Sequence, residues 1–337
     1  MTDGRDSHPH AISVVIPVFR IDEALQPLLD ELESLRITQH SPGGRQFEVV
    51  ETVLVFDGDQ AEQAAQLQGL TAERSHARVV WLSRNFGQHP ATLAGMSAST
   101  GEWIVTMDED GQFPPSSIGP LLDCALDTKS PVVYGQPSLV TPHPMWRRLG
   151  SWIARTLFNL LVGSNNWARF SSFRLILGEI GRSVGAYCTN ETYLDVALSW
   201  VSPRSASTKV AYRSEHSTSG YRFTKLLAHF LRMFLTLGTR PMRIFAALGG
   251  LAATGGFLLA ATLVYRRVVL GFPVGFASTL ALLLILTGLI LLGLAVLSEY
   301  VGLIVRSAIG RPLYVVTANP LDSALYRANT LNDRLPG

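Results

Sequence analysis

The chain has 337 residues, of which 47% are hydrophobic and 16% are charged, and its formal net charge is +2. This composition is too apolar for an ordinary soluble protein, and the near-neutral charge gives no sign of a nucleic-acid partner. The only two cysteines, Cys124 and Cys188, argue against a disulfide framework and are typical of a reducing compartment. The sequence therefore predicts a protein with a globular part and a separate apolar part.

Strand and helix patterns alternate along the first third of the chain. Apolar runs predict strands over residues 12–19, 47–56, 77–82, 103–107 and 131–135. Apolar residues at helical spacing predict helices over residues 22–35, 60–70 and 89–99. This alternation predicts an α/β domain with a mostly parallel, Rossmann-like sheet, in which the loops at the carboxyl ends of the strands form the ligand crevice.

The main polar motif lies in residues 103–115, which read WIVTMDEDGQFPP. Asp108 and Asp110 are separated by one residue after an apolar run, and in an extended segment such residues face the same way. Gln112 continues that face, while Gly111 and the two prolines turn the chain away. Two converging carboxylates predict a site for a divalent cation that could neutralise a diphosphate.

Four motifs together resemble the inverting family-2 glycosyltransferases of the GT-A fold. They are the run VVIPVF, the strand ending LVFDGD, the loop LSRNFGQHPATLAGM and the turn MDEDGQFPP. The resemblance covers residues 12–316 and is most specific for the polyprenyl-phosphate subgroup, which includes dolichol-phosphate mannose synthase and the undecaprenyl-phosphate aminoarabinose and glucose transferases. It implies an enzyme of the cell envelope that transfers a sugar from a nucleotide-sugar to polyprenyl phosphate.

The resemblance also implies which residues bind the sugar donor. Pro17 and Phe19 match the positions that pack against the nucleotide base. Val55 and Asp57 match the positions that contact uracil and ribose, and Arg84 adds a cation nearby. We therefore expect these five residues to line the nucleotide site.

The metal and acceptor positions follow from the same resemblance. Asp108, Asp110 and Gln112 match the residues that hold Mg²⁺ or Mn²⁺ on the diphosphate, where the cation stabilises the charge of the leaving group. Arg147 and Ser151 match a later pair that meets the lipid phosphate, four residues apart on one face of a helix predicted over residues 145–162. These residues are the expected catalytic group.

Three positions depart from the family pattern. Phe56 stands where the family usually has aspartate, and Ile21 where it usually has glutamate. Pro137 stands where an arginine commonly meets the lipid phosphate. The base of the donor nucleotide is therefore left open.

Two other hypotheses remain. Glu191 and Asp195 lie where other GT-A enzymes place a general base, which an alcohol acceptor needs and an ionised phosphate does not. We interpret both acids as structural, but transfer to a lipid-linked hydroxyl with Asp195 as base stays open. A catalytically silent membrane scaffold is the third hypothesis, because the departures above affect donor and acceptor positions.

The last third of the chain predicts contact with a lipid bilayer. Residues 244–265 and 276–298 contain no charged residue, and each is long enough to cross a hydrocarbon core about 30 Å thick. The predicted organisation is a polar tail, a catalytic domain, an interfacial amphipathic helix, two transmembrane helices, and a juxtamembrane segment with a tail, over residues 1–10, 11–222, 223–242, 243–300 and 301–337.

Basic residues predict the orientation of these spans. Lysine and arginine precede the first span and follow the second, at Lys225, Arg232, Arg240, Arg243, Arg306 and Arg311. The positive-inside rule then predicts that both termini and the catalytic domain are cytoplasmic. With no signal peptide visible, the sequence predicts a multi-pass protein of the cytoplasmic (inner) membrane. The family suggests assembly into a homo-oligomer through the membrane helices.

Overall fold

The computed structural model describes residues 8–58, 60–138, 170–188, 193–202, 204–213, 240–269, 275–308 and 312–322. The chain divides into two compact units. The first is formed by residues 1–155, 165–220 and 312–337, and the second by residues 156–164 and 221–311.

The described part of the first unit contains the α/β elements. Its strands are β1 (His10–Val18), β2 (Gln39–His40), β3 (Gln46–Phe56), β4 (Ala77–Leu82), β5 (Trp103–Thr106), β6 (Val132–Pro137), β7 (Arg174–Leu177), β8 (Ser205–Val210) and β9 (Val316–Thr317). Its α-helices are α1 (Leu25–Ser34), α2 (Ala61–Ala72), α3 (Gln88–Ala98), α4 (Ile118–Thr128), α6 (Gly178–Tyr187) and α7 (Leu194–Val201). The strands and helices predicted up to residue 135 are confirmed, with ends that differ by a few residues.

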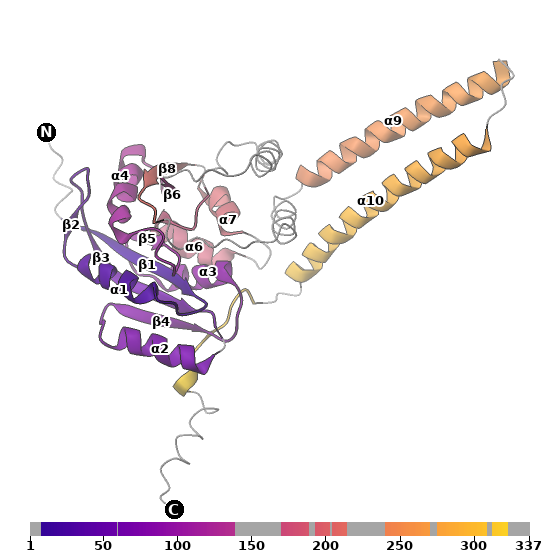
Figure 1. The fold of residues 1–337 in the computed structure, drawn as a ribbon. Coiled ribbons are helices and arrows are strands. Elements are labelled where there is room, and N and C mark those ends of the chain that lie inside the picture. The colour runs from indigo at the N-terminus through magenta and orange to yellow at the C-terminus, as the bar shows by residue number, and fades with distance from the viewer. Residues whose placement is uncertain are drawn as a thin grey trace, which may run out of the picture. The chain divides into compact units, whose positions relative to one another are not determined.

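These strands form one sheet in the order β8-β6-β7-β5-β1-β3-β4-β9, and β2 pairs with β3 (Figure 1). Strands β4, β3, β1 and β5 are parallel to their neighbours in this group, as the βα alternation predicts. In contrast, β7 lies between β5 and β6 and is antiparallel to both. The predicted parallel pairing is therefore confirmed for β4, β3, β1 and β5, whereas the sheet beyond β5 is mixed.

Apolar side chains cover both faces of the sheet, because successive residues of a strand point to opposite faces. Val14 and Ile16 pack in a core with α1 and α4, whereas Val15 packs in a second core with α3 and α7. Helix α1 buries its leucines at the spacing of one helical face, Leu25, Leu28, Leu29 and Leu32. Each such side chain contributes about 2 kcal/mol by leaving water.

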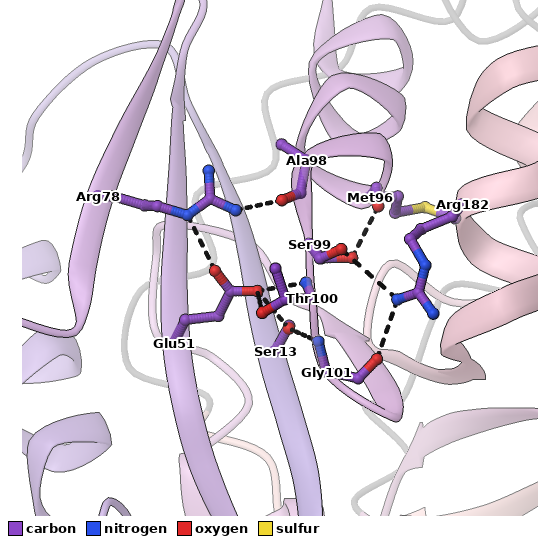
Figure 2. Close-up of polar contacts among 9 residues, drawn as sticks. All are labelled: Ser13, Glu51, Arg78, Met96, Ala98, Ser99, Thr100, Gly101 and Arg182. Carbon is purple, nitrogen blue, oxygen red and sulfur yellow. Dashed lines mark hydrogen bonds and ion pairs between the residues drawn. The ribbon is translucent and has the colours of Figure 1, made fainter.

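A polar network joins the amino ends of the strands around Glu51, which is 8% exposed (Figure 2). Its Oε1 accepts hydrogen bonds from Ser13 Oγ at 2.7 Å and from Thr100 N at 2.5 Å, and its Oε2 accepts one from Arg78 Nε at 2.9 Å. Ser13 Oγ in turn accepts a hydrogen bond from Gly101 N at 2.8 Å. The network fixes the chain immediately before β5, the strand that leads into the acidic motif.

The edge of the sheet beyond β4 is covered by residues from the end of the chain. Val316 pairs with Leu82 in antiparallel β9, and Ser83 N donates to the carbonyl of Val315 at 3.0 Å. The hydroxyl of Tyr314 donates to Ser97 Oγ at 3.2 Å. Residues 312–322 thus belong to the first unit and add β9 to its sheet, a contact that the sequence did not predict.

The second unit contains two long helices, α9 (Arg240–Val269) and α10 (Phe276–Ala308), which include the two predicted apolar segments. Among the described residues, one window, Ile285–Gly302 in α10, is long and apolar enough to cross a membrane. The number of spans therefore stays a prediction. Most of the predicted interfacial helix and all of the predicted helix over residues 145–162 lie outside the described residues.

Candidate active site

The acidic motif lies in a turn at the carboxyl end of β5. The strand ends at Thr106, and residues 109 and 110 form the turn. Gly111 follows with a φ of 63°, a left-handed conformation that glycine adopts without strain. The premise that Asp108 and Asp110 share one face of an extended segment is therefore wrong, since the strand stops before both of them.

Asp108 is held by donors from two other elements. Gln88 Nε2, at the start of α3, donates to its Oδ1 at 2.5 Å, and Ser172 Oγ donates to its Oδ2 at 2.6 Å. Ser172 lies here because β7 is antiparallel to β5, which brings the start of β7 beside the end of β5. Sequence reasoning did not include Ser172 among the site residues.

Gln112 is held by the segment that follows β8. Its backbone N donates to Asp110 Oδ1 at 3.1 Å, and its Oε1 accepts a hydrogen bond from the Tyr212 hydroxyl at 2.6 Å. Burial raises the pKa of Tyr212, and the negative charges of Asp110 and Asp108 raise it further, so the phenol stays a donor. Sequence reasoning missed Tyr212, which lies two residues after the end of β8, a strand that was not predicted.

Glu109 connects the acidic turn to the end of β1. Its Oε2 accepts a hydrogen bond from Phe19 N at 3.0 Å, and its carboxylate also accepts one from Arg20 N. Burial raises the pKa of Glu109 to about 7, with a further contribution from the charges of Asp22 and Asp108. The end of β1 carries two predicted base-binding residues, of which Phe19 is 44% exposed and Pro17 is buried.

Asp57 fixes the loop before α3. Its two carboxylate oxygens accept hydrogen bonds from Phe86 N and Gly87 N, each at 2.7 Å. Burial raises the pKa of Asp57, although these hydrogen bonds and the Arg84 charge oppose the shift. Arg84 itself is exposed, with its guanidinium 4.1 Å from the centre of the Phe86 ring.

The fifth predicted donor residue, Val55, has a different environment. Its side chain is fully buried in the core that includes α3. It therefore has no surface for a ligand, and any contact of this residue with a nucleotide would have to use its backbone. The five predicted donor residues thus differ widely in their exposure.

The donor atoms of the acidic turn fit a hard divalent cation. Asp108, Asp110 and Gln112 offer oxygen ligands, which Mg²⁺ and Mn²⁺ prefer. In the part of the chain that the structure describes, no three His, Cys, Asp or Glu side chains form a ready metal cage. A cation held here would complete its shell with water and, when the donor is bound, with phosphate oxygens, which is the usual way that Mg²⁺ binds at nucleotide sites.

Asp195 lies in a buried cluster. Its carboxylate forms an ion pair with Arg174, and the hydroxyl of Tyr134 also bonds to it. These three residues are 9%, 4% and 2% exposed. Burial raises the pKa of the Asp195 carboxyl, but the group is already engaged by two partners.

The predicted acceptor residues Arg147 and Ser151 lie outside the described residues, as does Glu191. Their roles therefore stay predictions. Within the described residues, Asp108, Asp110 and Gln112 lie in or next to one turn, and hydrogen bonds connect this turn to Gln88, Ser172, Phe19 and Tyr212. That these residues bind a metal stays a prediction.

Comparison with known proteins gives a consistent result. The undecaprenyl-phosphate 4-deoxy-4-formamido-L-arabinose transferase of Pseudomonas aeruginosa (strain LESB58) is 32% identical over 94% of this chain and 94% of its own. The protein with the same description from Pectobacterium carotovorum is 29% identical over 93% of this chain and 96% of its own. The crystal structure of glucosyl-3-phosphoglycerate synthase from Mycobacterium tuberculosis aligns over 68% of this chain and 80% of its own, with 16% identity and a TM-score of 0.46.

The sequence profile of one family also matches directly. Residues 13–183 match Glycosyl transferase family 2, and this range contains most of β1, all of β2 to β7, and the acidic turn. The predicted resemblance is confirmed by this match and by relatives that align along almost the whole chain. The chain therefore belongs to glycosyl transferase family 2.

Proposed function

We propose that the protein transfers one sugar from a nucleotide-sugar to polyprenyl phosphate, with inversion at the sugar carbon. The relatives that align along 94% of this chain are described as undecaprenyl-phosphate sugar transferases, which supports a lipid phosphate as the acceptor. The apolar window in α10 supports a membrane location for the reaction.

The structural observation that carries this proposal is that the Asp195 carboxylate is buried and already bonded. An alcohol acceptor must lose a proton as it attacks, so it needs a free general base. The Asp195 carboxylate is buried and already bonded to Arg174 and Tyr134, which makes it a poor base for an incoming hydroxyl. A phosphate acceptor is ionised before it attacks and needs no such base.

In the proposed reaction, an oxygen of the lipid phosphate attacks the anomeric carbon of the donor sugar. The bond from that carbon to the donor phosphate breaks, and the nucleoside diphosphate leaves with the electron pair. Asp108, Asp110 and Gln112 would hold a divalent cation, which supplies positive charge to the departing diphosphate. Gln88 and Ser172 orient the Asp108 carboxylate for this role.

The remaining donor residues support binding. Asp57 holds the loop that carries Arg84, and Glu109 holds the end of β1 that carries Phe19. Arg147 and Ser151 are proposed to bind the lipid phosphate. Among the departures, Phe56 is 1% exposed and packs edge-on against Trp81, with the ring centres 5.5 Å apart. Because an apolar side chain stands where the family usually has aspartate, the identity of the base in the donor nucleotide is not assigned.

The proposed setting is the cytoplasmic face of the inner membrane. In this proposal residues 11–222 form the catalytic domain, 223–242 an interfacial helix and 243–300 two transmembrane helices, with both termini cytoplasmic. The basic residues that flank the two apolar segments support this orientation. A homo-oligomer formed through these helices is part of the same proposal.

The test is a transfer assay with purified full-length protein and a panel of radiolabelled nucleotide-sugars. Each donor is offered polyprenyl phosphate or, separately, a polyprenyl-diphosphate sugar that carries free hydroxyl groups. Product formed only with polyprenyl phosphate, and lost when the divalent cation is chelated, supports the proposal. Transfer only to the lipid-linked sugar would favour a hydroxyl acceptor, and no transfer or nucleotide-sugar binding with any donor would favour a silent scaffold.

A further inference from the structure

The segment that leaves β8 holds both ends of Gln112. The Tyr212 hydroxyl donates to Oε1 of its side chain at 2.6 Å, and Arg213 N donates to its backbone carbonyl at 2.8 Å. Tyr212 and Gln112 are 100 positions apart in the sequence, so this contact depends on the tertiary fold. A distant part of the chain therefore holds one candidate metal ligand in place.

This segment is also anchored by contacts that do not involve Gln112. The Tyr212 ring packs edge-on against Phe113 with the ring centres 5.2 Å apart, and Phe113 stacks on Phe173 at 4.9 Å. The Arg213 guanidinium forms two hydrogen bonds to Glu31 on α1, at 2.8 and 2.9 Å. The position of the hydroxyl is therefore set by rigid neighbours.

The chemistry of this hydrogen bond selects one orientation of the carboxamide. A side-chain amide carries an oxygen and an NH₂ group, and only the oxygen can accept from a phenol or bind a cation. A carbonyl oxygen has two lone pairs, so one remains for a second partner when Tyr212 occupies the other. Without the hydroxyl, the amide would lose the partner that holds its oxygen, and the bound cation alone would have to fix its orientation.

We propose that Tyr212 is a positioning residue that turns the Gln112 carboxamide oxygen toward the cation of the proposed site. This inference rests on the proposed function, because it assumes that Gln112 is a ligand. The Tyr212 hydroxyl acts through Gln112 and does not itself touch the cation or the substrates. Its effect should therefore vanish when Gln112 is removed.

The test measures binding of Mn²⁺ alone to purified full-length protein by electron paramagnetic resonance. Tyr212→Phe keeps the ring against Phe113 and removes only the hydroxyl. Losing one hydrogen bond of this kind should raise the Kd for Mn²⁺ about 2- to 10-fold. Tyr314→Phe is the matched control, since it removes a phenol hydrogen bond to Ser97 outside the site and should leave the Kd unchanged.

A double-variant comparison separates positioning from a general structural effect. In a Gln112→Ala background, Tyr212→Phe should cause no further change in the Kd. An unchanged Kd in Tyr212→Phe alone, or an equal effect with and without Gln112, would overturn this inference while leaving the metal site standing. If the wild-type protein and Asp110→Asn bind Mn²⁺ equally, or neither binds it, the proposed metal site and this inference both fail.

Discussion

Two glutamates at opposite ends of the same sheet differ in how completely they are paired. At the amino end, Glu51 accepts hydrogen bonds from Ser13, Thr100 and Arg78, and although burial raises its pKa, these partners hold the pKa below the usual value of 4.5. At the carboxyl end, Glu109 has two backbone donors and nearby carboxylates, and burial raises its pKa to about 7.

This difference separates a structural region from the proposed active site. The amino end supplies a donor for each oxygen of its buried carboxylate, which stabilises the fold. The carboxyl end gathers Asp108, Glu109 and Asp110 in one turn, where Asp108 accepts from the neutral side chains of Gln88 and Ser172 and Glu109 accepts from backbone N–H groups. Crowded negative charge costs stability but attracts a cation, which is the usual compromise at an active site.

The largest expected effect is the loss of transfer in Asp110→Asn. Removing one carboxylate from the proposed cation site should slow sugar transfer about 100-fold or more, because charge on the leaving diphosphate is less stabilised. The thermal unfolding midpoint should change little. Asp127→Asn, an exposed acid on α4, is the control and should retain full transfer; equal losses in both variants would contradict the assignment.

The next effect is on stability, in Glu51→Gln. The substitution removes the charge that Arg78 pairs with and sets an amide NH₂ against existing donors, so it should lower the free energy of unfolding by about 3 kcal/mol. Urea unfolding of the purified protein measures the change. If sugar transfer per folded molecule fell as much as in Asp110→Asn, the assignment of stability to the amino end and of catalysis to the carboxyl end would be wrong.

A smaller loss is expected in Ser13→Ala. This buried hydroxyl donates to Glu51 and accepts from Gly101 N, and its removal should cost about 1 kcal/mol of unfolding free energy. Ser34→Ala is the matched control, because Ser34 makes a single exposed hydrogen bond to the carbonyl of Glu31. A loss in the control as large as in Ser13→Ala would mean that burial of the network is unimportant.

The smallest expected effects are on the pH dependence of stability, to which Glu51 and Glu109 contribute slopes of opposite sign. Glu51 has a lowered pKa in the folded protein, so its stabilisation is present above pH 4.5 and is lost as the pH falls below it. Glu109 has a raised pKa, so the folded protein keeps a proton that the unfolded chain releases, and stability falls as the pH rises from 4.5 to about 7.

Unfolding midpoints of the cation-free protein between about pH 2 and pH 8 would measure both slopes. Glu51→Gln should flatten the slope of stability below pH 4.5 and leave the slope at higher pH unchanged. Glu109→Gln should flatten the slope between pH 4.5 and about 7. Matching profiles for wild type and Glu109→Gln would contradict the raised pKa of that residue.

The sequence predicts the parallel half of the sheet well because the signals there are local. Strands β1, β3, β4 and β5 are each followed by a helix of their own, so a short window contains the pattern. The positions of β7 and β9 depend on pairing between distant segments, such as Thr106 with Arg174 and Leu82 with Val316. No local pattern encodes such pairs.

The same distinction applies to the candidate site. Asp108, Asp110 and Gln112 were found because they are close in sequence, although the turn that joins them is not the extended segment that was expected. Ser172 and Tyr212 reach the turn from 64 and 100 residues away, and neither follows a recognisable motif. Asp57 was found by resemblance, but its bonds to Phe86 and Gly87 required coordinates.

The pairing of β9 with β4 has a consequence for biosynthesis. The strand that completes the sheet is translated only after both long apolar helices, so the nascent catalytic unit has an open edge at β4 until β9 has been made. Unpaired backbone groups along such an edge are a template for wrong partners on neighbouring chains. Ribosomes that stall between α10 and β9 should therefore release chains that are unusually prone to aggregate.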